Sequence, residues 1–170
     1  MQRMPYADIA KCPEHIRKLI ATNPLNMVRM CAHATPEVFE GFYKFGSGFF
    51  AASKIPPDLK EIAILRAGYH AKASYETTQH ESMARGIGMS DAVLAAVKKG
   101  GKHPGVLSDI QQAVLDFADE LIVNARVSDE TLANIRKHFS DQLVVDLIFL
   151  IGFYMMVSRL LETTGVPLDA

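Results

Sequence analysis

The sequence has little cysteine, and its two cysteines, Cys12 and Cys31, form no metal-binding or disulfide pattern. It contains no Cys-x-x-Cys, no zinc-type spacing of cysteine and histidine and no dense cysteine framework, which fits a reducing compartment. The N-terminal segment lacks the apolar run of a secretory signal. We therefore expect a cytoplasmic protein that is neither a zinc domain nor a disulfide scaffold.

An excess of charge of either sign is also missing. Lysine and arginine number 18 against 19 acidic residues, for a formal net charge of -1, and no basic block stands out along the chain. This balance lacks the electrostatic footprint of a nucleic-acid-binding protein. The most apolar stretch, Leu143 to Val157, is interrupted by Asp146 and is too short to span a bilayer. We expect neither nucleic acid nor a membrane as a partner.

The chain has enough apolar residues to bury one substantial core, with 49% hydrophobic content over 170 residues. No strand pattern is present, so the sequence predicts an all-α fold in a single domain, with an N-terminal arm and first helix over 1–24 and the main domain over 25–170. The predicted helices are 13–22, 25–34, 36–50, one opening at Pro57, one from about 74 to the glycines at 86–88, 91–98, 108–124, 128–138 and 142–163.

Short local signals support several of these helix ends. Thr35 is the predicted N-cap of the helix over 36–50, which begins with a proline, and Ser90 is the predicted N-cap of the helix over 91–98. Gly86 or Gly88 supplies the left-handed residue that ends the preceding helix. The helix that opens at Pro57 is apolar on nearly every face, which predicts that it is buried.

The helix over 73–87 has polar residues on its apolar side. A step of about 100° per residue puts Glu76 and His80 on the stripe that should face the protein, where an ionisable group costs free energy unless it is paired. Their i,i+4 spacing makes them partners. The inward face carries Ala73, Glu76, Thr77, His80, Met83, Ala84 and Ile87, and the outward face carries Ser74, Thr78, Glu81, Ser82 and Arg85.

Two interpretations of the Glu76 and His80 pair stay open from the residues alone. Burial raises the pKa of a carboxylate and lowers that of a histidine, while their mutual attraction does the reverse, so the pair can titrate near neutrality, where proton transfer is efficient. The alternative is a structural ion pair that holds two helices together, because structural networks also perturb pKa values.

Two further residues are candidates for the same site. Glu61 shares a face with buried apolar positions, although it also lies in the early turns of its helix, where the helix dipole favours acids. His70 is expected to reach the pocket of His80. The set of Glu76, His80 and His70 lacks a His-x-x-x-His pair and a second carboxylate at ligand spacing, so we predict no metal.

A weak internal echo relates two apolar helical segments. Glu61 to Tyr69 and Asp146 to Tyr154 each begin with an acid and carry a tyrosine at the same distance. This similarity is what two related helical hairpins would produce. No repeat of solenoid length is present.

Two motifs carry a resemblance to a known family. The segments Leu-Lys-Glu-Ile-Ala-Ile-Leu-Arg-Ala from Leu59 and Ser-Tyr-Glu-Thr-Thr-Gln-His-Glu from Ser74 resemble the carboxymuconolactone decarboxylase family, which shares its fold with alkylhydroperoxidase D. The likeness runs from about residue 25 to the C-terminus. It implies an alkylhydroperoxidase D-like helical bundle that forms a homo-oligomer, a trimer or a hexamer, with sites near subunit interfaces.

The resemblance also implies roles for individual residues. In the peroxidase branch a glutamate precedes Cys-x-x-Cys and a histidine; Glu61 and His80 match the ends, but Ala73 and Glu76 stand at the cysteine positions. Without a thiolate pair, dithiol peroxidase activity is not expected. The branch with Tyr-Glu-Trp-x-x-His is closer, since Tyr75 matches its tyrosine.

Thr77 stands where that branch has tryptophan. This replacement either opens a large volume in the pocket wall or lets a neighbouring helix move in. The resemblance therefore implies a catalytic set of Glu61, Glu76 and His80, with Tyr75, Thr77 and His70 expected to bind substrate.

The function that the resemblance implies is a lyase or isomerase without a cofactor, acting on a small carboxylated lactone or enolisable acid. His80 would donate the proton, Glu76 would orient its ring, and Glu61 would act behind them. The alternatives are a relative of alkylhydroperoxidase that has no dithiol peroxidase activity, and a non-catalytic oligomeric binding protein in which Glu76 and His80 only lock helices together.

Overall fold

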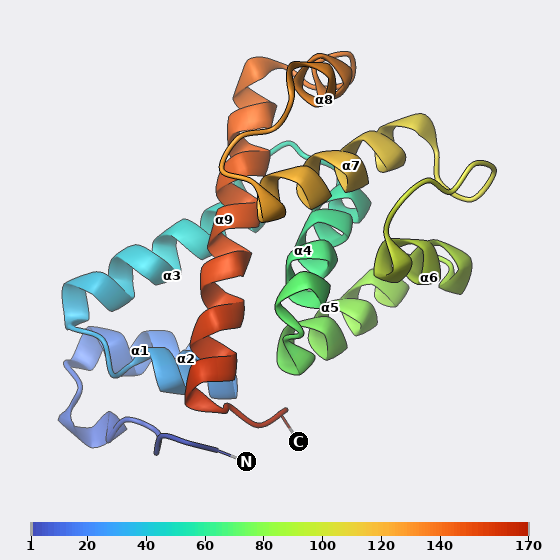
Figure 1. Ribbon diagram of the computed structural model, residues 1–170. Helices are drawn as coiled ribbons and strands as arrows, with labels where there is room; N and C mark the ends of the chain where they lie inside the picture. Colours follow the sequence, from blue (N-terminus) through green and yellow to red (C-terminus); the bar gives the residue numbers. More distant parts are fainter. Residues whose placement is uncertain (1, 170) are drawn as a thin grey trace. The chain divides into compact units, whose positions relative to one another are not determined.

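The computed structural model describes residues 2–169 of the chain and is all-α, which confirms the predicted fold class (Figure 1). A short 3-10 helix, Ile9–Lys11, lies in the segment that the sequence leaves without periodicity. The α-helices are α1 (Glu14–Thr22), α2 (Asn26–Cys31), α3 (Pro36–Ala51), α4 (Pro57–Ala71), α5 (Ser74–Gly86), α6 (Asp91–Lys99), α7 (Asp109–Val123), α8 (Asp129–Ile135) and α9 (Asp141–Thr164).

Most of the predicted helix ends agree with the structure. The Ser90 side chain accepts a hydrogen bond from the Val93 amide, and Gly88 has a φ of 90° just beyond α5. Thr35 occupies the N-cap of α3 but makes no capping hydrogen bond with its side chain. Pro13 is the N-cap of α1 and not its first residue, because the backbone turns into the helical region only at Glu14.

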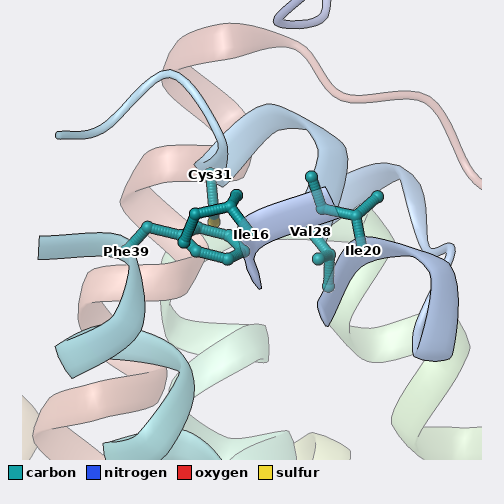
Figure 2. Close-up of a cluster of buried hydrophobic side chains, with 5 residues drawn as sticks. All are labelled: Ile16, Ile20, Val28, Cys31 and Phe39. Atoms are coloured by element: carbon teal, nitrogen blue, oxygen red, sulfur yellow. The ribbon is translucent and has the colours of Figure 1, made fainter. Parts of the chain in front are cut away.

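The chain divides into two compact units. The first comprises Met1–Ala52 and Arg159–Ala170, so the predicted boundary at residue 24 falls inside it. Within this unit α2 is tied to the C-terminal tail, since the Asn26 amide donates to a carboxylate oxygen of Asp169 at 2.7 Å. One cluster of its buried side chains comes from α1, α2 and the start of α3 (Figure 2): Ile16, Ile20, Val28, Cys31 and Phe39.

The second unit, Ser53–Ser158, is built around α4. Helix α4 packs against α5, α6 and α7, and α7 packs against α8. Every residue from Leu59 to Gly68 is buried, which confirms the burial predicted for this helix. Such a helix brings even its ionisable side chains into the interior, and these side chains build the candidate site.

Helix α9 begins in the second unit and is longer than its apolar sequence suggests. It has 24 residues, and an 18-residue window within it has a mean hydropathy of 2.0, so by length and composition it is the one helix in residues 2–169 that could cross a membrane, and the expectation that this stretch is too short was wrong. A core helix of a soluble protein passes the same test, and 44% of the window is buried. Leu147, Leu150 and Ile151 are among its fully buried side chains.

Candidate functional site

Three ionisable side chains meet in the interior of the second unit. Glu61 projects from α4, and Glu76 and His80 project from consecutive turns of α5. All three are almost completely buried, with exposed fractions of 4%, 4% and 6%. The structure therefore brings together the three residues that the sequence put forward as a catalytic set.

The face of α5 that is buried is narrower than the sequence predicts. Ala84 is buried together with Glu76 and His80, as expected. Met83 and Ile87 are 46% and 50% exposed, so their predicted inward position was wrong. Met83 lies in the last turn of α5, and Ile87 is the C-cap that follows it.

His80 lies between the two glutamates. Its Nδ1 atom is 2.7 Å from the Oε2 atom of Glu61, and its Nε2 atom is 3.6 Å from the Oε2 atom of Glu76. A carboxylate only accepts hydrogen bonds, so the short contact places a proton on Nδ1. The pairing predicted from the i,i+4 spacing is present, but Glu61 is the closer partner and fixes the orientation of the ring.

Glu76 is the group whose ionisation is most disfavoured in this cluster. Burial raises the pKa of its carboxyl group, the neighbouring His80 lowers it, and the charge of Glu61 raises it again. Two acids thus share one histidine in a poorly hydrated place. Such a carboxyl group keeps its proton to higher pH than an ordinary glutamic acid.

A fourth side chain, Tyr154 of α9, belongs to the cluster and was not identified from the sequence. Its ring meets the ring of His80 edge to face, with centroids 4.9 Å apart and an interplanar angle of 89°. Burial raises the pKa of its hydroxyl well above the ordinary value, and Glu76 and then Glu61 add to that rise. The signal in the sequence was the similarity between the segments that begin at Glu61 and Asp146. In the second segment, Tyr154 lies on an otherwise apolar stripe.

Tyr75 and Thr77 flank Glu76 on α5. Tyr75 is buried, and the Thr77 hydroxyl donates to the carbonyl oxygen of Ala73 at 3.1 Å. A Cβ atom placed on Gly68 of α4 would lie 3.1 Å from the Thr77 methyl group. Where tryptophan is usual in the resembling branch, the space beside Thr77 is therefore taken by the backbone of α4.

His70 has partners outside this cluster. Its Nε2 atom is 2.9 Å from the Oδ1 atom of Asp119 and 3.0 Å from a guanidinium nitrogen of Arg66. Arg66 is buried, and its Nη1 atom donates to the carbonyl oxygens of Val97 and Lys98 at the end of α6. The structure thus places His70 in a network that fastens α6 and α7 to α4.

The described residues contain no cluster of metal-binding type, and one surface hollow lies apart from the candidate site. In the described part of the chain, no group of three or more histidine, cysteine, aspartate or glutamate side chains is arranged to hold a metal ion. A hollow of about 490 Å³ opens where α4, α6 and α7 begin, between Asp58, Ser90 and Gln111. Its lining includes no residue of the Glu61, Glu76 and His80 cluster.

Comparison with known proteins finds likeness in structure only. No protein-family model matches the chain, and no curated protein matches its sequence. An uncharacterized peroxidase-related protein from Ralstonia eutropha JMP134, described as an alkylhydroperoxidase AhpD core, is similar with a TM-score of 0.80 and 19% identity over 99% of this chain and 92% of that one.

Two other solved structures give the same picture. An uncharacterized peroxidase-related protein from Silicibacter sp. TM1040 has a TM-score of 0.77 and 18% identity, over 99% of this chain and 92% of that one. A variant of the debrominase Bmp8 in complex with 2,3,4-tribromopyrrole has a TM-score of 0.75 and 14% identity, over 99% and 91%. These likenesses show that the chain has the all-α fold of the alkylhydroperoxidase AhpD core.

Proposed function

We propose that this protein is an acid/base enzyme of the carboxymuconolactone decarboxylase type, which removes carbon dioxide from a small carboxylated lactone without a cofactor. The observation that carries the proposal is the contact of 2.7 Å between Glu61 and the Nδ1 atom of buried His80. It leaves the opposite ring nitrogen, Nε2, as the group that can exchange a proton with a ligand.

The arrangement divides three roles among three side chains. Glu61 holds the ring of His80 and stabilises its protonated form, as the carboxylate does in other acid/base pairs with histidine. His80 donates the proton through Nε2. Glu76, whose pKa is raised by burial, lies with its Oε2 atom 3.6 Å from the Nε2 atom of His80 and holds the proton that recharges the histidine. The roles of the two glutamates are thus exchanged relative to the sequence prediction, in which Glu76 orients the ring.

These three groups supply the proton transfer of the reaction. The bond between the lactone carbon and its carboxylate breaks, carbon dioxide leaves, and the electron pair passes into the conjugated carbonyl to form an enolate. Protonated His80 then gives its proton to carbon, so that one carboxylate and one proton become carbon dioxide and a carbon–hydrogen bond. A buried site assists because the leaving carboxylate loses the hydration that stabilises it in water.

A dithiol peroxidase is the alternative suggested by the fold, and the side chains disfavour it. That reaction needs two neighbouring thiols, one of them ionised. Ala73 and Glu76 stand at the matching positions, and both cysteines of the chain, Cys12 and Cys31, belong to the first unit, whereas His80 belongs to the second. A hydroperoxide assay with a dithiol reductant should therefore give no turnover.

The test compares two histidine variants. We expect His80→Gln to lower kcat for release of carbon dioxide from 4-carboxymuconolactone by about 10²- to 10⁴-fold, the usual contribution of a positioned acid or base. Glutamine keeps a donor for Glu61, so circular dichroism should show an intact fold. The matched control, His70→Gln, removes a histidine from the Asp119 network and should keep the wild-type rate.

Two results would contradict the proposal. One is a His80→Gln enzyme that decarboxylates the lactone at the wild-type rate. The other is a folded wild-type protein that leaves the lactone unchanged at every pH between 5 and 9, a range chosen to span about two pH units on either side of neutrality.

A further inference from the structure

The side chain of Tyr154 lies beside the acid/base cluster, and its hydroxyl group is not among the fully buried hydroxyls that lack a partner. The Tyr154 residue is 7% exposed, and its contacts within residues 2–169 are ring contacts with His80 and Phe153. The Phe153 ring also meets it edge to face, at 77° with centroids 5.5 Å apart. A phenol hydroxyl that is not fully buried can donate to an acceptor oxygen that a ligand supplies.

The charges around this hydroxyl favour a neutral donor. Glu76 and Glu61 both oppose ionisation of Tyr154, as burial does. The phenol therefore keeps its proton to a higher pH than an ordinary tyrosine. A neutral phenol beside a histidine can stabilise an oxyanion that develops on a bound carbonyl, because it donates without bringing charge of its own.

A fully buried hydroxyl without a partner lies on the same face of α9. The Oγ atom of Ser158 is fully buried and has no hydrogen-bonding partner in the described part of the chain. Ser158 follows Tyr154 by one helical turn, so both side chains belong to one stripe of the helix. Unsatisfied buried hydroxyls are rare, and this one, a turn away from the Tyr154 phenol, adds a polar group to this stripe of α9.

We propose that Tyr154 is a ligand-binding catalytic residue of this site, whose hydroxyl donates a hydrogen bond to the carbonyl oxygen of a carboxylated lactone held against His80. The proposal rests on the proposed function for the identity of the ligand. It assigns Tyr154 the task that the glutamates and His80 leave undone, which is to hold the oxygen on which the enolate charge collects. The ligand class is then one with an acceptor oxygen conjugated to the carbon that is protonated.

The test measures binding first and turnover second. The binding probe is muconolactone, a lactone that lacks the carboxyl group to be lost, titrated by calorimetry into the full-length protein. We expect Tyr154→Phe to weaken its Kd by about tenfold, the effect of losing one hydrogen bond to a strongly polar oxygen. The control Tyr69→Phe removes a hydroxyl that donates a hydrogen bond to Glu81 of α5 at 2.8 Å. This variant should leave the Kd unchanged.

A second variant guards against a fold effect. Replacement of Tyr154 by 3-fluorotyrosine keeps the shape of the ring and makes its hydroxyl a stronger donor, so the Kd for muconolactone should become smaller. With 4-carboxymuconolactone, the loss in kcat for Tyr154→Phe should exceed the loss in binding, because the hydrogen bond strengthens as charge develops.

The outcomes separate this inference from the proposed function. Equal Kd values for wild type, Tyr154→Phe and the fluorotyrosine protein would overturn the role of Tyr154, as would a wild-type protein that binds no muconolactone. Binding that depends on Tyr154 in a protein that never decarboxylates the lactone would support the role of Tyr154 and refute the decarboxylase.

Discussion

Helix α4 sends Glu61 to one cluster of ionisable side chains and Arg66 to another, and the two clusters are built differently. In the Arg66 cluster the guanidinium group donates to Asp119 and to two carbonyl oxygens at the end of α6, so its charge and its donors are matched. In the Glu61 cluster two acids face one histidine, and the pKa of Glu76 is raised.

This difference separates a structural histidine from a candidate catalytic one. His70 and His80 are both bonded to an acid from another helix, so pairing alone does not tell them apart. The distinction is in what remains unsatisfied. The His70 network closes on itself, whereas the His80 cluster keeps an excess acid beside a tyrosine, and this imbalance indicates a place for a ligand.

The largest effect on stability should come from breaking the matched cluster. We expect Arg66→Met to lower the free energy of unfolding by about 3 kcal/mol, because it leaves Asp119 and the α6 carbonyl oxygens without their donor. Urea denaturation followed by circular dichroism measures the change. His80→Gln should cost much less, and a larger loss there than at Arg66 would reverse the comparison.

The next effect concerns the fit of the Arg66 side chain against α6. Gly100 ends that helix with φ 71° and ψ 175°, a region that is open almost only to glycine. A Cβ atom there would lie 2.7 Å from a guanidinium nitrogen of Arg66, whereas nothing lies within 4 Å of one on Gly101, whose φ is also positive. We expect Gly100→Ala to lower stability by about 2 kcal/mol.

Gly101→Ala is the matched control for the Gly100 variant, since it carries backbone strain without the contact to Arg66. Thermal melts of the two variants should differ, with the Gly100 protein unfolding at the lower temperature. Equal melting temperatures would show that Arg66 moves aside at little cost and that its cluster is looser than its hydrogen bonds indicate.

The smallest effect should be the pH dependence at Glu76. Its folded-state pKa is raised, chiefly by burial, above the ordinary value of 4.5. Below pH 4.5 both folded and unfolded states hold the proton; as pH rises above it, the unfolded state ionises first, and wild-type stability falls until the folded pKa is passed. Glu76→Gln should remove that fall, so its advantage in urea unfolding should grow above pH 4.5 and then level off.

Glu120 provides a comparison of opposite sign. Hydrogen bonds from Thr131 and Ser128 lower the pKa of this exposed carboxyl group. Its contribution to stability is present above pH 4.5 and is lost as pH falls through the folded pKa. Glu120→Gln should therefore lose stability at neutral pH. A Glu76→Gln protein with the same pH profile as Glu120→Gln would contradict the raised pKa of Glu76.

The sequence by itself determined the helices and the residues that could do chemistry. The 3.6-residue period of apolar positions, with Ser90 and Gly88 at helix ends, predicts the elements because these signals act over a few neighbouring residues. The same period put Glu76 and His80 on an inward face, and the motif resemblance added Glu61. The error at Met83 and Ile87 has the same origin, because a helical period predicts a face but not how far a neighbouring helix covers it.

Only the tertiary structure decided which groups meet. The i,i+4 spacing favoured Glu76 as the partner of His80, but packing of α5 on α4 brought Glu61 closer, and Tyr154 arrived from α9 far along the chain. His70 is bonded instead to Asp119 of α7. Contacts between distant segments depend on how whole helices pack, and that information is spread over the chain and is not contained in any single motif.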